Sequence, residues 1–383
     1  MATENNNKNL NVPNLRFPEF CGEWTKTKLG DIGTTLIGLT YSPKDVVPSG
    51  GTIVLRSSNI KGGLTDYNDI VRVNKKIKES IITRVDDLLI CARNGSARLI
   101  GKNAILKQED CGHTFGAFMM VYRAQNNKFV HQLLNTKRYY AQVGENLGAR
   151  INQITTSDLN SFEFYFPQTL NEQNKIASML SLLDDRIATQ IKIIEDLKKL
   201  KSAIRARVFK QLESNCECWT EIGNMLQYEQ PSKYLVASTE YSDSYATPVL
   251  TANKAFILGY TDEEFGIYSK GECVIFDDFT MDVKFVNFPF KVKSSAIKIL
   301  TANSGYDLYF VYEYLQNLGL VSEEHKRHYI SEIEPMIVAC PTFEEQQNIS
   351  KLLRSFDNKI ECANRELTLY NKQKQYLLSQ MFI

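Results

Sequence analysis

Residues 171–212, NEQNKIASMLSLLDDRIATQIKIIEDLKKLKSAIRARVFKQL, decide the fold, because a second version of this stretch closes the chain. The second version is residues 345–383, EQQNISKLLRSFDNKIECANRELTLYNKQKQYLLSQMFI. A gapless alignment that places Ile187 on Ile360 gives five identical pairs upstream of it in these stretches: Glu172 on Glu345, Gln173 on Gln346, Ile176 on Ile349, Leu180 on Leu353 and Asp184 on Asp357. Internal repetition over such a long interval predicts a duplicated architecture.

Both stretches have the apolar period of an α-helix. Apolar residues recur every three or four positions from Ile176 to Val208, and from Ile349 to Met381 the steps of four and three alternate as in a coiled-coil seam. Neither stretch contains Gly or Pro, so each predicts a helix of roughly 40 residues, or ~60 Å at about 1.5 Å per residue. Because such long apolar stripes are unstable in water, we expect the two helices to pack on each other. An antiparallel pairing fits, since each intervening segment must leave one helix end and return to the other.

The repetition extends beyond the helices. Trp24-Thr25 is repeated as Trp219-Thr220, and Gly30-Asp31-Ile32 corresponds to Gly223-Asn224-Met225. The globular segments that follow share almost no sequence, yet each has short apolar runs between turn residues and one expected helix, over 128–142 and near 308–318.

The sequence therefore predicts an α+β fold. Two mixed α/β globular domains are separated by two long antiparallel coiled-coil helices, in an internally duplicated chain with pseudo-twofold symmetry. The expected segments are an N-terminal arm (1–24), a first domain (25–167), a central helix (168–213), a second domain (214–341) and a C-terminal helix (342–383).

Composition excludes several classes of protein. The 383 residues are 43% hydrophobic and 23% charged, as in globular proteins, and no apolar run approaches the ~20 residues of a membrane span. The polar start MATENNNKNLNV lacks the apolar core of a secretion signal, and the eight cysteines are scattered, so we expect a cytoplasmic protein with reduced thiols. A protein that holds DNA alone usually carries a basic excess. With a net charge of +1, this chain is expected to need partners for any such binding.

Catalytic and metal motifs are incomplete. The loop 95–103 resembles a phosphate-binding loop, but it has five residues between its glycines and Asn after Lys. Asn287-Phe288-Pro289-Phe290 resembles a methyltransferase tetrad without the accompanying glycine-rich loop, and Cys216-x-Cys218 and His325-x-x-His328 lack a second ligand pair. These patterns predict a chain that is not an enzyme and binds no metal.

Polar turns favour nucleic acid instead. Residues 56–61, 93–98 and 144–153 combine arginines, amides and hydroxyls, the groups that read base edges and bind phosphates. Their expected counterparts in the second domain are 251–254, 277–280 with Lys284, and 325–329. Any one such turn is more often plain solvated surface, but six at matched positions favour a binding function. The candidate DNA contacts are Arg56, Ser57, Asn59, Lys61, Arg93, Asn94, Ser96, Arg98, Arg150, Asn152, Gln153, Asn253, Lys254, Thr280, Lys284, Lys326, Arg327 and Tyr329.

Three motifs together resemble the specificity subunit of type I restriction-modification systems. They are the repeated proline followed by Glu-Gln-x-x-Ile-x-x-x-Leu-x-x-x-Asp-x-x-Ile, the opening Arg16-Phe17-Pro18-Glu19-Phe20 before Trp24, and the turn Asp87-Leu-Leu-Ile-x-x-Arg93-x-Gly95-Ser96. The resemblance spans the whole chain. It implies two target recognition domains, each reading half of an asymmetric bipartite site in double-stranded DNA, on helices that set the spacer.

The resemblance also implies partners. Two methyltransferase subunits would dock along the helices and restriction subunits would join them, with no cofactor bound by this chain. S-adenosylmethionine would belong to the methyltransferase partner, and ATP and Mg to the restriction partner. The helix residues expected to dock partners are Gln173, Ile176, Leu180, Asp184, Ile187, Gln346, Ile349, Leu353, Asp357 and Ile360.

One departure and one alternative stay open at this point. The second domain has Asp277-Asp278 where the first has its Arg-x-Gly-Ser turn, and these carboxylates either accept from cytosine amino groups or are structural. The alternative function is a coiled-coil scaffold or adaptor whose domains bind proteins rather than DNA. It explains the helices equally well, but it gives no reason for two divergent domains built to one plan.

Overall fold

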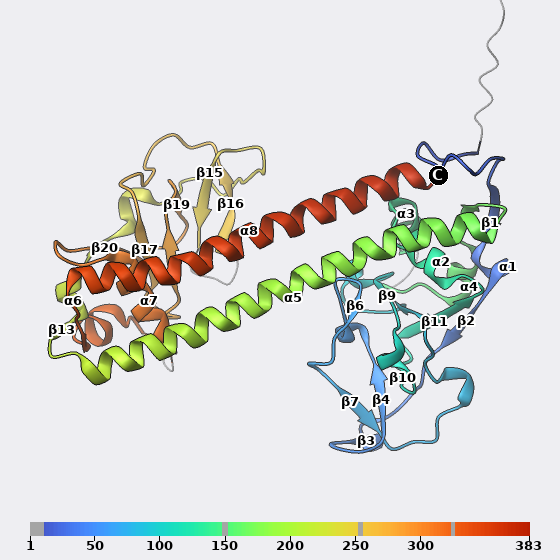
Figure 1. Ribbon diagram of the computed structural model, residues 1–383, viewed down its shortest axis with the longest axis horizontal. Helices are drawn as coiled ribbons and strands as arrows, with labels where there is room; N and C mark the ends of the chain where they lie inside the picture. Colours follow the sequence, from blue (N-terminus) through green and yellow to red (C-terminus); the bar gives the residue numbers. More distant parts are fainter. Residues whose placement is uncertain (1–10, 148–151, 252–255, 323–325) are drawn as a thin grey trace, which may run out of the picture. The chain divides into compact units, whose positions relative to one another are not determined.

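The computed structural model describes residues 11–147, 152–251, 256–322 and 326–383, which form two compact units. Unit 1 comprises the chain up to Lys192 together with Arg365–Ile383, and unit 2 comprises Ile193–Asn364. The helices α5 (Leu170–Asn215) and α8 (Phe343–Met381) each contribute one part to both units (Figure 1). The predicted fold class is confirmed, with a long helix between two domains of mixed helix and sheet.

Unit 1 is built on two four-stranded sheets. The strand order is β2-β11-β8-β9 in the first sheet, which is antiparallel, and β10-β4-β7-β3 in the second, where only β10 and β4 are parallel. Two further pairs are β1-β12 and β5-β6. The strands are β1 (Thr25–Lys28), β2 (Gly33–Ile37), β3 (Val46–Val47), β4 (Thr52–Leu55), β5 (Ile60–Lys61), β6 (Leu64–Thr65), β7 (Val71–Val73), β8 (Leu88–Cys91), β9 (Asn103–Ile105), β10 (Thr114–Phe115), β11 (Met119–Ala124) and β12 (Glu163–Phe166).

Strand alternation explains how the first sheet is buried on both faces. Leu88 and Ile90 of β8 pack into one core with the helices, whereas Leu89 and Cys91 pack into a second core between the two sheets. The α-helices described in unit 1 besides the long ones are α1 (Leu29–Ile32), α2 (Asn127–Leu133), α3 (Lys137–Leu147) and α4 (Thr156–Ser161).

The helix predicted over 128–142 is two helices, α2 and α3. Thr136 lies at the break, where its hydroxyl donates to the Leu133 carbonyl (2.7 Å) and accepts from the Tyr139 amide (3.4 Å). A threonine side chain that bonds to nearby backbone competes with helix continuation, which explains the interruption.

Unit 2 repeats the plan with fewer strands. Its sheets have the orders β14-β20-β17-β18 and β16-β15-β19, with β13-β21 as a separate pair. The elements are β13 (Trp219–Glu221), α6 (Ile222–Met225), β14 (Leu226–Glu229), β15 (Thr247–Leu250), β16 (Ile257–Thr261), β17 (Cys273–Asp277), β18 (Val283–Val286), β19 (Lys291–Val292), β20 (Ile297–Ala302), α7 (Leu308–Asn317) and β21 (Ile337–Ala339). The helix predicted near 308–318 is therefore confirmed as α7.

The main sheets of the two units correspond, since β2-β11-β8-β9 matches β14-β20-β17-β18 and the β4–β10 parallel pair matches β15–β19. The sequence alignment of Trp24 with Trp219 is nevertheless wrong. Trp24 precedes β1 and is 2% exposed against Phe129 and Phe382, whereas Trp219 lies inside β13 and is 50% exposed. The strand register shifts the second tryptophan by two positions, so only the first reaches a core.

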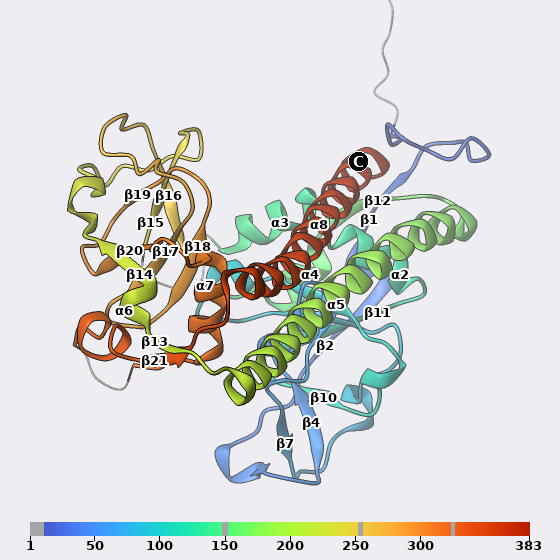
Figure 2. The same cartoon turned by 60° about the vertical axis from the view of Figure 1, so that its left-hand side comes forward.

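Within each unit, α5 and α8 pack antiparallel, as predicted. In unit 1 Asp184 pairs with Lys374 and Gln190 donates to Glu366. Residue numbers that increase along α5 therefore meet residue numbers that decrease along α8. In unit 2 Lys201 pairs with Asp357. Figure 2 shows the C-terminal end of α8 beside the first turns of α5 from a second direction. No helix among the described residues is long and apolar enough to cross a membrane.

The N-terminal arm is anchored on the start of α5. The Arg16 guanidinium donates to both carboxylate oxygens of Glu172, at 2.7 and 2.9 Å, and the Trp24 indole donates to the same carboxylate. The Leu15 amide donates to the carbonyl of Gln380 near the end of α8. Arm, helix start and helix end are thus one packed assembly within unit 1.

Candidate nucleic-acid interface

Three of the polar turns predicted in the first domain converge on one surface pocket. The pocket has a volume of about 960 Å³ and is lined by Arg56 and Ser57 after β4, by Arg93 and Asn94 after β8, and by Asn152 before α4. Leu39, Tyr41 and Phe118 add apolar and aromatic walls. Cationic, amide and aromatic groups on a concave surface suit a ligand with charged edges and flat rings.

Hydrogen bonds tie these turns to one another. The Asn94 side chain donates to Ser57 Oγ (2.9 Å), and its carbonyl oxygen accepts from the Ser96 amide (3.0 Å). Asn152 donates from its side chain to the Gly95 carbonyl (3.0 Å), while Arg93 and Gln153 form an isolated β-bridge. The turn 93–96 is therefore held from two sides, which limits the conformational entropy lost when a ligand binds.

The cations of this surface differ in how they are paired. Arg56 is bound by Asp69 (2.7 Å) and Lys61 by Asp66 (2.7 Å). Arg93 and Arg98 are both exposed, and the Arg93 guanidinium lies 5.1 Å from the centre of the Phe118 ring. Arg93 therefore offers a guanidinium that is ordered by an aromatic ring rather than by a carboxylate.

One predicted contact of the first domain is not at the surface, and another lies outside the described residues. Asn59 is buried, because its side chain donates to the carbonyls of Asp66 and Asp69 (2.9 Å each) and accepts from the Arg56 amide (2.9 Å). Its prediction as a DNA contact is wrong, since its amide groups are already used to fold the turn. Arg150 lies outside the described residues.

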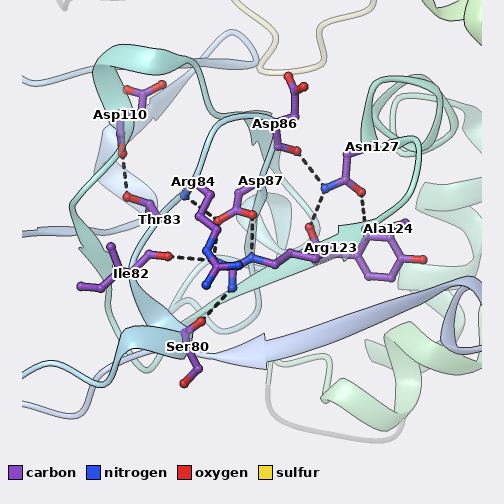
Figure 3. Close-up of polar contacts among 11 residues, drawn as sticks. Ser80, Ile82, Thr83, Arg84, Asp86, Asp87, Asp110, Arg123, Ala124 and Asn127 are labelled. Carbon is purple, nitrogen blue, oxygen red and sulfur yellow. Dashed lines mark hydrogen bonds and ion pairs between the residues drawn. The ribbon is translucent and has the colours of Figure 1, made fainter.

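A buried ion pair supports the strand that leads to the Arg93 turn (Figure 3). Asp87, directly before β8, accepts from Nε and Nη2 of Arg123 at 2.7 Å each and from the Arg84 amide at 2.9 Å. Arg123 also donates to the carbonyls of Ser80 and Ile82. This network fixes the start of β8 and end of β11, so the turn at the other end of β8 emerges from a rigid frame.

In the second domain, two of the predicted turns lie side by side. Asp278 accepts from the amides of His328 (3.0 Å) and Tyr329 (2.8 Å), while Asp277 accepts from the amides of Phe279 and Thr280 (2.8 and 3.1 Å). Both aspartates are buried, so of their two possible roles the structural one applies.

The remaining predicted contacts of the second domain differ in their exposure. Thr280 and Arg327 are exposed, Lys284 is half-buried on β18, and Lys326 is exposed and pairs with Glu332 (3.0 Å). Tyr329 is 0% exposed between Tyr228 and Phe276, so its prediction as a DNA contact is wrong. Asn253 and Lys254 lie outside the described residues.

The predicted partner-docking stripe of the helices faces the interior of the chain. Ile176, Leu180, Ile187 and Leu353 are buried in the cores, Ile349 packs against one of them, and Ile360 is half-buried. The polar members bond within the chain: Gln173 and Gln346 donate to the carbonyls of Pro167 and Pro341, and Asp184 and Asp357 pair with Lys374 and Lys201. Most apolar members of the stripe are thus covered by their own fold, whereas Ile349 and Ile360 are half-buried and 43% of the Asp357 side chain stays exposed.

Sequence reasoning missed the exposed apolar residues. Phe118, before β11, is 58% exposed, and the long helices expose Leu182, Ile193, Leu200, Leu352, Leu369 and Tyr376. An exposed phenylalanine at a strand end has no distinguishing signal in a single sequence. Leu200 is a position of the predicted apolar stripe that the structure leaves exposed, and the other helix residues lie between the stripe positions. Among the described residues, no group of His, Cys, Asp and Glu is arranged to hold a metal ion.

Comparisons with known proteins find a matching family and similar proteins. Residues 22–199 match the family described as "Type I restriction modification DNA specificity domain". The chain is 40% identical over 176 residues to the Escherichia coli type I restriction enzyme EcoR124I/EcoR124II specificity subunit, a match that spans 43% of this chain and 44% of that protein. The chain therefore spans less than half the length of this relative.

Two other similarities span nearly the whole chain. The putative type I restriction enzyme MjaX specificity subunit of Methanocaldococcus jannaschii is 25% identical over 97% of this chain and 96% of its own length. The crystal structure of a type I restriction-modification S subunit from M. genitalium has a TM-score of 0.62 at 17% identity, covering 97% of this chain and 99% of that one. At 17% identity, the similarity to the M. genitalium structure shows a shared fold.

Proposed function

Because the chain belongs to the family of type I restriction-modification specificity subunits, we propose that each of its two domains reads one half of an asymmetric bipartite DNA sequence. The observation that carries the proposal is the convergence of polar turns from separate parts of the first domain on one pocket. In that domain Arg93, Asn94 and Asn152 are the groups that reach base edges, and Arg98 and Lys61 are suited to phosphates.

The second domain supports the asymmetry of the site. It has the strand order of the first, but the turn after its central strand β17 carries buried aspartates and Thr280 in place of two exposed arginines. Two domains with one framework and different turn chemistry are what recognition of two different half-sites requires. A coiled-coil adaptor gives no reason for this difference.

The chain acts in this proposal as a recognition subunit without catalysis of its own. Methyltransferase subunits supply S-adenosylmethionine chemistry, and restriction subunits supply the steps that need ATP and Mg. The near-neutral net charge agrees with partners that contribute much of the phosphate contact. Docking would use the outward faces of α5 and α8, where Leu182, Leu369 and Tyr376 are exposed, rather than the buried stripe.

Methylation mapping tests the proposal. Genomic adenine methylation is mapped by long-read sequencing in cells that express the methyltransferase partner with this chain, without it, or with Arg93→Ala. We expect a bipartite motif that disappears without the chain and is weakened in the variant. Arg84→Ala is the matched control, because Arg84 is also exposed but lies before β8, at the end opposite Arg93. Methylation of the same motif in cells lacking the chain would refute the specificity role.

A further inference from the structure

We infer that Phe118 is a positioning residue for Arg93, and that the ordered Arg93 guanidinium reads a guanine in the half-site of the first domain. The inference rests on the proposed function and names what one part of that site recognises. It starts from an unusual placement: a phenylalanine 58% exposed at the rim of a polar pocket, with an arginine stacked on its ring.

The backbone fixes the two residues to each other. The amides of Ala92 and Arg93 both donate to the Phe118 carbonyl, at 2.9 and 3.0 Å, so the turn after β8 and the residue before β11 move as one piece. The side chains then meet at 5.1 Å from guanidinium carbon to ring centre. A cation over an aromatic face is attracted by the ring quadrupole, and this restricts a side chain that is otherwise highly flexible.

Arg93 is chemically available for a base. Among the residues that the structure describes, no carboxylate lies within ion-pair distance of it, whereas Arg56, Lys61 and Arg123 are each held by an aspartate. A guanidinium presents a planar fork of donors, and guanine offers two acceptors, O6 and N7, at matching spacing in the major groove. A charge needed only for phosphates would not require this orientation.

The second domain lacks the pair at the equivalent position. The pairing of β8 with β11 and of β17 with β20 aligns Cys91 with Asp277, so Phe279 stands where Arg93 is and Ala296 where Phe118 is. The anchoring bond is kept, because the Asp278 amide donates to the Ala296 carbonyl at 3.0 Å. The same scaffold thus presents a guanidinium in one domain and an aromatic ring in the other, which localises part of the asymmetry to a single site.

The test uses the assembled complex of this chain with its methyltransferase partner. After the wild-type motif has been mapped, binding is measured by competition on duplexes that carry each base in turn at every recognised position. For Arg93→Ala we expect discrimination to fall about 5- to 150-fold at one guanine and to stay unchanged at other positions. Replacing that guanine by 7-deazaguanine, which lacks the N7 acceptor, should weaken the wild type and leave the variant unaffected.

Variants of Phe118 separate positioning from folding. Phe118→Leu keeps an apolar side chain of similar size but removes the ring, so it should lose part of the discrimination at the same guanine. Phe118→Tyr keeps the ring and should restore it. Arg93→Lys, which keeps the charge but not the fork, should behave like Arg93→Ala at that guanine.

The outcomes distinguish the inference from the proposed function. Arg93→Ala that weakens all sequences equally would make Arg93 a phosphate contact and overturn the inference, with the specificity role intact. Full discrimination in Phe118→Leu would remove the positioning role. A wild-type complex that shows no sequence preference would instead refute the proposed function itself.

Discussion

Lys201 and Lys374 stand at equivalent positions of the two helix repeats, and we expect their removal to have unequal effects. In unit 2 Lys201 binds Glu313 (2.6 Å) and Asp357 (2.6 Å), and Glu313 is fully buried with Arg205 at 3.3 Å. In unit 1 Lys374 binds the partly exposed Asp184, which also accepts from the neutral Gln132 side chain (2.9 Å). Gln132 and Glu313 correspond, because each lies three residues after a helix phenylalanine whose amide bonds to the N-cap side chain.

The magnitude follows from what each substitution leaves behind. Lys201→Met leaves a buried carboxylate with one remaining cation, so we expect unit 2 to lose about 3 kcal/mol of unfolding free energy. Lys374→Met leaves a carboxylate that water reaches and an amide that still donates to it, so unit 1 should lose only about 1 kcal/mol. The double variant Lys201→Met/Glu313→Gln removes the buried charge together with its partner and should recover more than half of the loss.

Hydrogen exchange measured by mass spectrometry reports the two units separately. Protection of amides in α7 follows unit 2, and protection in α2 follows unit 1, so each unit serves as the control for the other. Equal losses for the two lysine variants, or a larger loss for Lys374→Met, would refute the reasoning. So would a double variant no more stable than Lys201→Met.

Two further predictions concern acid stability and the spacer. Burial lowers the pKa of His131 to about 4 in the folded chain, whereas the imidazole of the unfolded chain takes up a proton as the pH falls below about 6.5. The free energy of unfolding should therefore drop by about 2 kcal/mol between pH 7 and pH 5. Urea unfolding of His131→Phe should lack this part of the pH dependence. One heptad inserted after Leu200 together with one after Asn358 keeps the contacts between α5 and α8 on both sides of the insertions. If the helices set the spacer, methylation mapping should show a spacer longer by ~3 base pairs with the same bases read. An unchanged spacer would exclude that role.

Periodicity predicted the long helices, the identities between the two stretches predicted the duplicated plan, and the connectivity of the intervening segments predicted the antiparallel pairing. A sequence displays all three directly. The sequence also located three turns that do converge on one pocket. It could not separate Asn94, which holds the turn and lines the pocket, from Asn59, whose amide is used up inside its own turn. A turn asparagine bonds to backbone or to a ligand with the same groups, and only the fold decides which. The prediction of Tyr329 as a DNA contact failed for a similar reason, since a tyrosine beside charged residues is expected to be exposed until its packing is known.

The identities between the two helix repeats have a physical explanation within the chain. Gln173 and Gln346 each bond to the proline carbonyl before their helix and accept from the start of a neighbouring domain helix, through Asn126 in unit 1 and the Asp307 amide in unit 2. Asp184 and Asp357 hold the equivalent lysines of the opposite helix. Similarity between the repeats therefore marks the junction that fixes each domain to its helices, and it is no evidence of a partner surface. The repeats agree at the junction, which both domains need, and the domains differ at Arg93 and Phe279, the equivalent positions at which we propose that they contact different bases.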